Sequence, residues 1–313
     1  MRIFNGIEHY VRGERPVVAS IGNYDGLHVG HRAILRRVVD DARRRNLPSM
    51  LITFDPHPVA VVAPERRPRL LQSRRQKLDE LESTSLSDLV ILQFNESLAA
   101  MSGEVFFERV LAPHIDFAAI HVGENFRFGH GRSGNLDLLR RIGDARGFAV
   151  SGMPAVQIDG HSVSSSAIRQ AVEAGEIERA GRMLGRCFSV AGEVVHGAGR
   201  GKQLEFPTAN VDVENEIVPR AGVYVTQTLA HGARYESVTN VGMRPTFGGR
   251  ELTVESHMFD FSDELYGERV EVCFLARVRD EMQFESGAEL ASQIARDRAA
   301  AEAYFHNLTF RQR

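Results

Sequence analysis

The stretch Gly22-Asn23-Tyr24-Asp25-Gly26-Leu27-His28-Val29-Gly30-His31 decides the fold of the first half of the chain. The apolar run 17–21 comes directly before it, and an apolar helical repeat follows it at Ile34, Leu35, Val38, Val39 and Ala42. Similar apolar runs lie at 50–54, 89–92 and 119–122. Continuous apolar strands that alternate with helices predict an α/β domain with a doubly wound parallel sheet.

The glycines and histidines of this stretch indicate what the turn binds. Glycine lets a ligand approach the backbone closely, and the N-terminus of a helix attracts anions. His28 and His31 can both donate hydrogen bonds to phosphate oxygens, and parallel sheets bind ligands at the carboxyl ends of their strands. A nucleotide is therefore expected here. The alternatives are a zinc site shared with His57 and a pair of histidines that cap the helix.

The second half of the chain has a different pattern. A helical stretch from about 164 to 184 gives way to strand-like runs at 188–195, 222–229, 235–241, 252–259 and 269–278, with glycines between them. Consecutive strands joined by short loops predict an antiparallel β-barrel, and Leu290, Ile294 and Ala301 predict an amphipathic C-terminal helix. The boundary is placed after residue 184, which gives domains of residues 1–184 and 185–313.

Composition is that of an ordinary soluble protein. Of 313 residues, 43% are hydrophobic and 25% are charged, and a net charge of −3 offers no positive field to nucleic acid or an anionic membrane. Without an apolar leader or a membrane-length apolar run, a cytoplasmic location is expected, and nothing indicates an oligomer. Cys187 and Cys273, far apart in apolar surroundings, are expected to be buried free thiols.

Three more motifs follow the histidine motif in order: Phe54-Asp55-Pro56-His57-Pro58, Gly123-Glu124-Asn125-Phe126-Arg127-Phe128-Gly129 and Ser164-Ser165-Ser166-Ala167-Ile168-Arg169. The His28-Val29-Gly30-His31 motif resembles that of the HxGH nucleotidyltransferases. The four motifs together resemble the prokaryotic FAD synthetases, which are bifunctional riboflavin kinase/FMN adenylyltransferases. The resemblance covers essentially the whole chain, and it implies that the first domain adenylylates FMN with ATP, giving FAD and pyrophosphate.

The same resemblance implies a set of binding residues in the first domain. Those for ATP are Gly22, Asn23, Asp25, His28, Gly30, His31, Ser164, Ser165 and Arg169, and the two histidines would be catalytic. Those for the flavin are His57, Asn125, Phe126 and Phe128. Residue type alone leaves two simpler interpretations open. Serines before a helix are often N-caps, and phenylalanines beside a sheet are often core residues.

The barrel half carries the second set of motifs. The basic loop His196-Gly197-Ala198-Gly199-Arg200-Gly201-Lys202 lacks the Gly-Lys-Ser/Thr ending of a P-loop, but the following Phe206-Pro207-Thr208-Ala209-Asn210 resembles riboflavin kinases. The resemblance implies ATP binding by Gly199, Arg200, Gly201, Lys202, Thr208 and Asn210, with Thr208 and Asn210 also ligating Mg²⁺. It further implies that Glu255 is the general base for the riboflavin 5′-hydroxyl and that Arg279 and Phe284 contact the flavin.

Glu205 departs from the riboflavin-kinase pattern, which has glycine at this position. A carboxylate there could repel phosphate, replace a metal ligand or exclude a left-handed backbone conformation. A second hypothesis is therefore an enzyme that only adenylylates FMN and whose barrel is kinase-impaired. A third hypothesis is a non-catalytic flavin sensor. In the histidine motif, Tyr24 stands where phenylalanine is usual.

Overall fold

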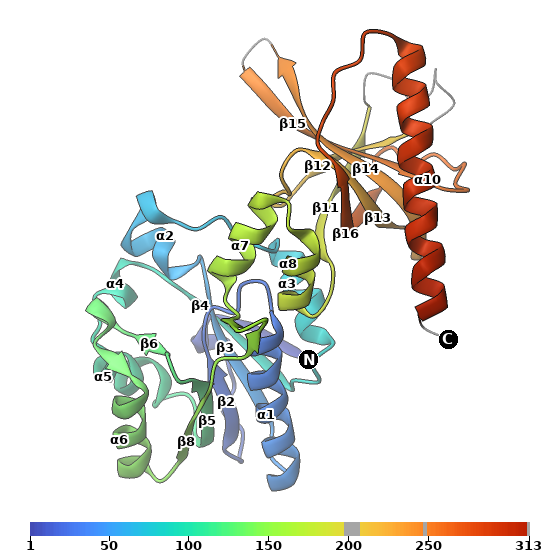
Figure 1. Cartoon of the computed structure of the whole chain (residues 1–313). Helices are drawn as coiled ribbons and strands as arrows, with labels where there is room; N and C mark the ends of the chain where they lie inside the picture. Colours follow the sequence, from blue (N-terminus) through green and yellow to red (C-terminus); the bar gives the residue numbers. More distant parts are fainter. Residues whose placement is uncertain (197–206, 247–248, 312–313) are drawn as a thin grey trace. The chain divides into compact units, whose positions relative to one another are not determined.

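The computed structural model describes residues 1–196, 207–246 and 249–311 (Figure 1). The chain divides into two compact units. The first unit consists of residues 1–69 and 74–163, and the second unit consists of residues 70–73 and 164–313. Within the described part of the chain, no helix has the length and apolar character needed to cross a membrane.

A six-stranded parallel sheet forms the centre of the first unit. The strand order is β1 (Arg2–Asn5), β4 (Asp88–Gln93), β3 (Ser49–Asp55), β2 (Val17–Ile21), β5 (Phe117–Gly123) and β8 (Ala149–Met153). The four apolar runs of the sequence are β2, β3, β4 and β5, so the predicted parallel sheet is confirmed. The edge strands β1 and β8 escaped prediction because both are partly exposed and lack a continuous apolar run.

Helices cover both faces of this sheet, with α1 and α6 on opposite sides (Figure 1). α1 (Val29–Arg45) and α3 (Arg74–Glu82) bury Leu35, Val38 and Leu81 against one face. α5 (Gly103–Phe106), the π-helical turn η3 (Phe107–Leu111) and α6 (Leu136–Arg146) cover the other. The shorter elements are η1 (Ile7–His9), α2 (Pro58–Val62), η2 (Pro64–Arg66), α4 (Glu96–Ala99), β6 (Arg127–Phe128), η4 (His130–Arg132), β7 (Gly134–Asn135), β9 (Gln157–Ile158) and β10 (His161–Ser162).

Strand β2 is the point at which the strand order of the sheet reverses. From β2 the chain runs through α1 to β3 on one side, whereas β5 pairs with β2 on the other side. Open parallel sheets bind ligands in the crevice outside the carboxyl end of such a strand. The turn after β2 carries the histidine motif, so the topology places that motif where the sequence predicted a nucleotide.

The second unit begins with two helices and continues as a closed antiparallel barrel. α7 (Ser165–Ala174) and α8 (Ile177–Leu184) replace the single predicted helical stretch, because Gly175 ends α7 with a left-handed φ of 79°. The barrel order is β11 (Phe188–Val195), β12 (Ala209–Val213), β15 (Gly249–Met258), β14 (Ala233–Thr246), β13 (Gly222–Ala230) and β16 (Arg269–Arg279), and α10 (Gly287–Arg311) follows. The predicted antiparallel barrel and C-terminal helix are confirmed; β12 had not been predicted, because Asn210 and Asp212 interrupt its apolar pattern.

The barrel interior contains a closed ring of five hydroxyl groups. Thr226, Ser237, Thr228, Ser256 and Thr239 are fully buried, and the hydroxyl oxygens of consecutive members lie 2.8 to 3.0 Å apart. A distance of 2.7 Å between Thr239 and Thr226 closes the ring. Thr239 donates to Ser256. Each hydroxyl has one proton, so every member of the ring can donate once and accept once in the same direction. The ring joins β13, β14 and β15.

The expectation of two free thiols is wrong. Cys187 and Cys273 form a disulfide, with Cα atoms 5.7 Å apart and 86 residues between them in sequence. Barrel closure explains this, because β11 pairs with β16 and places Ser189 opposite Cys273, next to the start of β11. Proximity that arises from pairing the first and last strands of a barrel has no local signature in the sequence.

Candidate active sites

The turn after β2 has an unusual backbone. Tyr24 and Leu27 take positive φ values of 52° and 37°, and Gly26 takes 82°. Left-handed backbone is unfavourable for a side-chain-bearing residue by about 1–2 kcal/mol. Both side chains are almost fully buried, and burial of a large apolar side chain contributes about 1.5–3 kcal/mol. Core packing therefore holds the turn in a conformation that its backbone alone would not favour.

His28 is the N-cap of α1. Its Nδ1 accepts a hydrogen bond from the backbone N–H of His31 at 3.3 Å, so the proton of the neutral imidazole is on Nε2. The two imidazole rings stack with centroids 3.6 Å apart, and a Cβ on Gly30 would lie only 3.1 Å from Cε1 of His28. The capping interpretation is thus correct for His28. It is compatible with anion binding, because the cap uses one nitrogen and leaves an N–H on the other.

His31 is a neutral imidazole. Burial, together with the nearby His28 and Lys77, holds its pKa well below the ordinary 6.5. Its Nδ1 is buried and has no hydrogen-bond partner among the described residues. Such an atom costs about 1–3 kcal/mol when it stays unpaired, which is typical of a position that a ligand completes. No group of three or more His, Cys, Asp or Glu in the described ranges could hold a metal ion, so the zinc alternative gains no support.

Lys77 of α3 also belongs to this site, although the sequence had not indicated it. Its Nζ donates to the carbonyl oxygen of Asn23 at 2.6 Å and to Oγ1 of Thr53 at 3.0 Å. Burial lowers the pKa of Lys77 to about 8, against the opposing effect of Asp25 and Asp55. Asp25 is itself buried. The signal for Lys77 is non-local, because the residue lies 54 positions after the backbone group that it binds.

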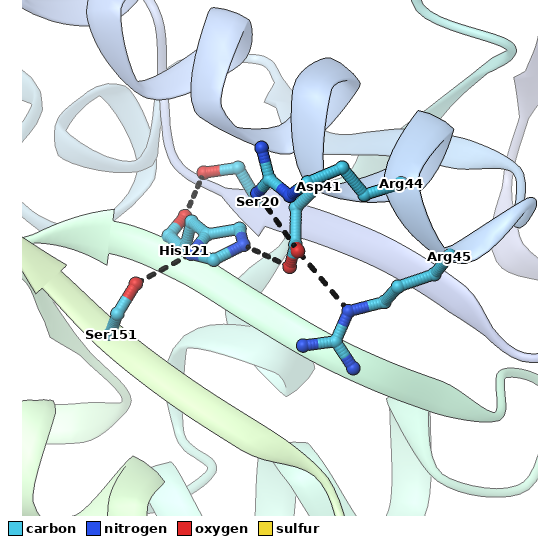
Figure 2. Close-up of polar contacts among 6 residues, drawn as sticks. All are labelled: Ser20, Asp41, Arg44, Arg45, His121 and Ser151. Atoms are coloured by element: carbon cyan, nitrogen blue, oxygen red, sulfur yellow. Dashed lines mark hydrogen bonds and ion pairs between the residues drawn. The ribbon is translucent and has the colours of Figure 1, made fainter.

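A hydrogen-bonded row connects Tyr24 of the turn to the sheet, and Figure 2 shows the part of it that runs from Ser20 to Ser151. Ser20 Oγ donates to the carbonyl of His121 at 2.5 Å, and because this uses its proton, Tyr24 must donate to Ser20 across 2.6 Å. His121 lies 2.9 Å from Asp41 of α1 through Nε2 and 2.5 Å from Ser151 of β8 through Nδ1. The row therefore connects the turn, α1, β5 and β8.

The residues predicted to bind the flavin lie on both loops beside the turn. His57 is the N-cap of α2, and its Nε2 is 3.2 Å from the side-chain amide of Asn23. Asn125 is exposed. Phe126 and Phe128 stack with centroids 5.2 Å apart and pack on the core of the first unit, so part of each ring has a structural role.

Ser164, Ser165 and Arg169 lie at the start of α7 in the second unit. Ser164 is the N-cap of that helix and accepts from Ala167 N–H at 3.2 Å, as the simpler interpretation required. The role of these three residues in binding ATP phosphates remains a prediction. The start of a ten-residue helix is a favourable place for anions.

The barrel brings two of the predicted kinase residues, Asn210 and Glu255, next to each other. Asn210 of β12 and Asn240 of β14 both pair in register with Glu255 of β15, so the three side chains are neighbours. No role had been predicted for Asn240 from the sequence. Nδ1 of His257 donates to the carbonyl of Pro207 at 2.8 Å and fixes the backbone just before Thr208.

The remaining predicted kinase residues are less well supported. Arg279 makes a bidentate ion pair with buried Asp297 of α10, at 2.9 and 2.7 Å, so its guanidinium ties α10 to the barrel. Phe284 is half-buried. Gly199, Arg200, Gly201, Lys202 and Glu205 lie outside the described residues.

Comparison with known proteins assigns a family to each half of the chain. Residues 11–167 match the family model described as FAD synthetase, and residues 184–305 match that described as riboflavin kinase. The bifunctional riboflavin kinase/FMN adenylyltransferase of Escherichia coli (strain K12) is 35% identical over 97% of this chain and 98% of that protein, and that of Pseudomonas fluorescens is 36% identical over 97% of each. A crystal structure named macrolide-efflux protein, from Streptococcus pneumoniae, has a TM-score of 0.87 and 27% identity over 96% of this chain and 99% of that one. The chain belongs to the family of bifunctional riboflavin kinase/FMN adenylyltransferases, the FAD synthetases.

Proposed function

We propose that this chain phosphorylates riboflavin to FMN in its barrel and adenylylates FMN to FAD at the turn after β2, using ATP in both steps. The observation that carries the proposal is the stacked pair of neutral histidines at the N-terminus of α1, at the switch point of a parallel sheet. Family membership of both halves supports the two-step assignment.

In the adenylyl transfer, a phosphate oxygen of FMN attacks the α-phosphorus of ATP. A new P–O bond forms, the bond from the α-phosphorus to the β-bridging oxygen breaks, and pyrophosphate leaves with the electron pair. The attacking oxygen is already anionic, so positioning and charge stabilisation are needed rather than a general base. The N–H groups of His28 and His31 would donate to the phosphate oxygens on which negative charge increases.

In the kinase step, the nucleophile is a neutral alcohol. Glu255 would accept the proton of the riboflavin 5′-hydroxyl while that oxygen attacks the γ-phosphorus of ATP and ADP leaves. Asn210 and Asn240 flank Glu255 on the neighbouring strands, which places amide groups beside the carboxylate. This arrangement supports a site for an alcohol and a phosphate side by side.

The donor chemistry beside Glu255 fits Mg²⁺. Nδ2 of Asn210 is 3.5 Å from the carbonyl of Thr208, which turns the amide oxygen away from that carbonyl. The Thr208 hydroxyl and Asn210 amide oxygen are hard ligands and would hold the ion. Bound Mg²⁺ would neutralise negative charge on the ATP phosphates.

We further propose a cytoplasmic enzyme that acts on small molecules, with no nucleic-acid or membrane partner and no oligomer required. The boundary is proposed at residues 184/185. Its support is that one family match ends at 167 and the other begins at 184. By contact, however, α7 and α8 cluster with the barrel.

An enzyme that only adenylylates FMN is the second candidate, because Glu205 occupies the usual glycine position. The test is to incubate the protein with ATP and Mg²⁺, starting from riboflavin in one reaction and from FMN in the other, and to separate FMN and FAD by chromatography. FAD from both flavins supports the two-step enzyme. FAD from FMN alone supports the second candidate, and Glu205→Gly should then restore the kinase. No product from either flavin contradicts both and leaves the flavin sensor.

A further inference from the structure

We propose that Lys77 is a positioning residue of the adenylyltransferase site: its ammonium fixes the turn that carries His28 and His31 and supplies positive charge to this anion-binding turn. The inference rests on the function proposed for the first unit. It adds a residue from a helix that none of the sequence motifs includes.

The contacts of Lys77 explain how it fixes the turn. Nζ donates to the backbone carbonyl of Asn23 at 2.6 Å and to the hydroxyl of Thr53 at 3.0 Å, while Thr53 itself donates to the Asn23 carbonyl at 3.1 Å. The ammonium thus closes a triangle between α3, the end of β3 and the first residues after β2. Asn23 is next to Tyr24, whose backbone has an unfavourable left-handed conformation. The hydrogen bonds to the Asn23 carbonyl therefore constrain the backbone directly beside it.

Two carboxylates act on this ammonium. Asp25 in the turn and Asp55 at the end of β3 favour its protonated form. On α1, the neutral His31 feels the lysine charge, which lowers the histidine pKa. The Asp55 carboxylate also forms an ion pair with Arg74 of α3, with Oδ2 of Asp55 3.3 Å from Nε of Arg74.

A second ion pair completes these surroundings. Arg32 of α1 pairs with Glu80 of α3, one turn after Lys77, so both charges compensate each other. With burial acting in the opposite direction to the two aspartates, the pKa of Lys77 is about 8, and the ammonium form prevails at neutral pH. A cation held within hydrogen bonds, instead of one on a mobile surface chain, has little conformational freedom to lose when phosphates bind.

The reaction needs such a group because two anions must meet. The FMN phosphate forms its bond to the α-phosphorus of ATP as pyrophosphate departs, and all the groups involved are negatively charged. The ammonium attracts them, and the fixed turn keeps the two imidazole N–H groups in place. Anions bind the protonated form better, so wild-type kcat/KM for FAD formation should decrease as the pH rises above about 8.

The experiment compares Lys77→Met and Lys77→Arg with Arg75→Met, which removes a positive charge from an exposed position of the same helix. The full-length proteins are assayed for FMN→FAD conversion across the pH range from about 6.5 to about 9.5, with riboflavin phosphorylation measured on the same preparations. If the wild type has no kinase activity, folding of each variant is checked instead by comparing its thermal unfolding with that of the wild type.

Lys77→Met should lower adenylyltransferase kcat/KM by about 100-fold, as expected for a misplaced catalytic constellation, while riboflavin phosphorylation keeps the wild-type rate and thermal unfolding stays cooperative. Lys77→Arg should retain more activity than Lys77→Met, and its kcat/KM should not decrease above pH about 8, because guanidinium stays charged. Arg75→Met should resemble the wild type.

Three results would overturn the proposal: wild-type-like activity of Lys77→Met, the same alkaline decrease in Lys77→Arg, or a Lys77→Met protein that has lost cooperative unfolding or both activities equally. Absence of FAD formation by the wild type is a separate outcome. That result would refute the function on which the inference rests before any variant is compared.

Discussion

At the scale of single residues, His28 illustrates how one side chain combines a structural and a chemical role. Its Nδ1 caps α1, and its Nε2 carries the proton available to a phosphate. Substitutions can separate the two, because asparagine caps a helix well, whereas alanine does not.

We therefore predict different effects of two variants. His28→Ala should reduce the free energy of unfolding by about 1 kcal/mol more than His28→Asn, since only asparagine retains a cap. Both should reduce kcat/KM for FAD formation by about 100-fold or more, since both lose the imidazole N–H. Urea unfolding and steady-state kinetics measure the two effects. Full activity of His28→Asn would mean that capping is the only function of this residue.

The residue scale also shows what sequence could and could not predict about the sites. His28, Gly30 and His31 lie within one turn, so their spacing already revealed a helix N-terminus with two imidazoles. Lys77 was missed because only the packing of α3 brings it to Asn23. Arg279 has a basic side chain suited to a ligand, but its ion pair with Asp297, 18 residues later, forms only when α10 packs on the barrel.

At the scale of elements, the row Asp41–His121–Ser151 holds α1, β5 and β8 together (Figure 2). Burial tends to raise the pKa of Asp41, but hydrogen bonds from His121 and Arg45 outweigh it and keep that pKa below 3.8. Burial lowers the pKa of His121 below 6.5, in spite of the nearby Asp41 carboxylate. Both pKa values are depressed on folding, so the associated stability is present at neutral pH and is lost on acidification.

Two effects follow for this row. The unfolding midpoint of the first unit should decrease as the pH falls from 6.5 through the lower pKa of folded His121, because the unfolded chain then binds a proton more readily. Asp41→Asn should lower the free energy of unfolding at neutral pH by about 1–3 kcal/mol, since it weakens charge-assisted hydrogen bonds. Denaturant titrations at several pH values measure both. A wild-type midpoint that rises on acidification would contradict this account.

A second prediction at the scale of elements concerns the hydroxyl ring that joins β13, β14 and β15. Thr239→Val keeps the side-chain shape but opens the ring, leaving Thr226 and Ser256 each without one partner. The free energy of unfolding should decrease by about 1–3 kcal/mol, the usual cost of buried unsatisfied hydroxyls. The half-exposed Thr253 of β15 offers a control, and Thr253→Val should change stability by less than about 0.5 kcal/mol. Equal effects of the two substitutions would show that the ring adds nothing.

Elements differ in how well their sequence predicts them. β2 and β11 were predicted with correct ends, since each is a strand bounded by turn residues. Strand β12 was not, because Asn210 and Asp212 interrupt its apolar pattern, and the division between α7 and α8 was missed although Gly175 is a local signal that ends a helix. Apolar periodicity in a sequence indicates which residues are buried. The pattern becomes weak in an element that carries polar residues of a functional site.

At the scale of the whole molecule, the histidine turn and the Glu255 site lie in different units. The histidine turn belongs entirely to the first unit, whereas Asn210, Asn240 and Glu255 belong to the second. Substitutions in the histidine turn should therefore abolish FAD formation and spare riboflavin phosphorylation, and substitutions of Glu255 should do the reverse. The disulfide between Cys187, just before β11, and Cys273 of β16 also lies within the second unit.

The measurement that tests this central claim most directly follows FMN and FAD over time in reactions of His31→Ala and Glu255→Gln with riboflavin, ATP and Mg²⁺. His31→Ala should accumulate FMN and form FAD at least about 100-fold more slowly than the wild type. Glu255→Gln should form FMN from riboflavin about 100-fold or more slowly, yet convert added FMN to FAD at the wild-type rate. Loss of both steps in either variant, or of neither step in both, would contradict the assignment of one site to each unit.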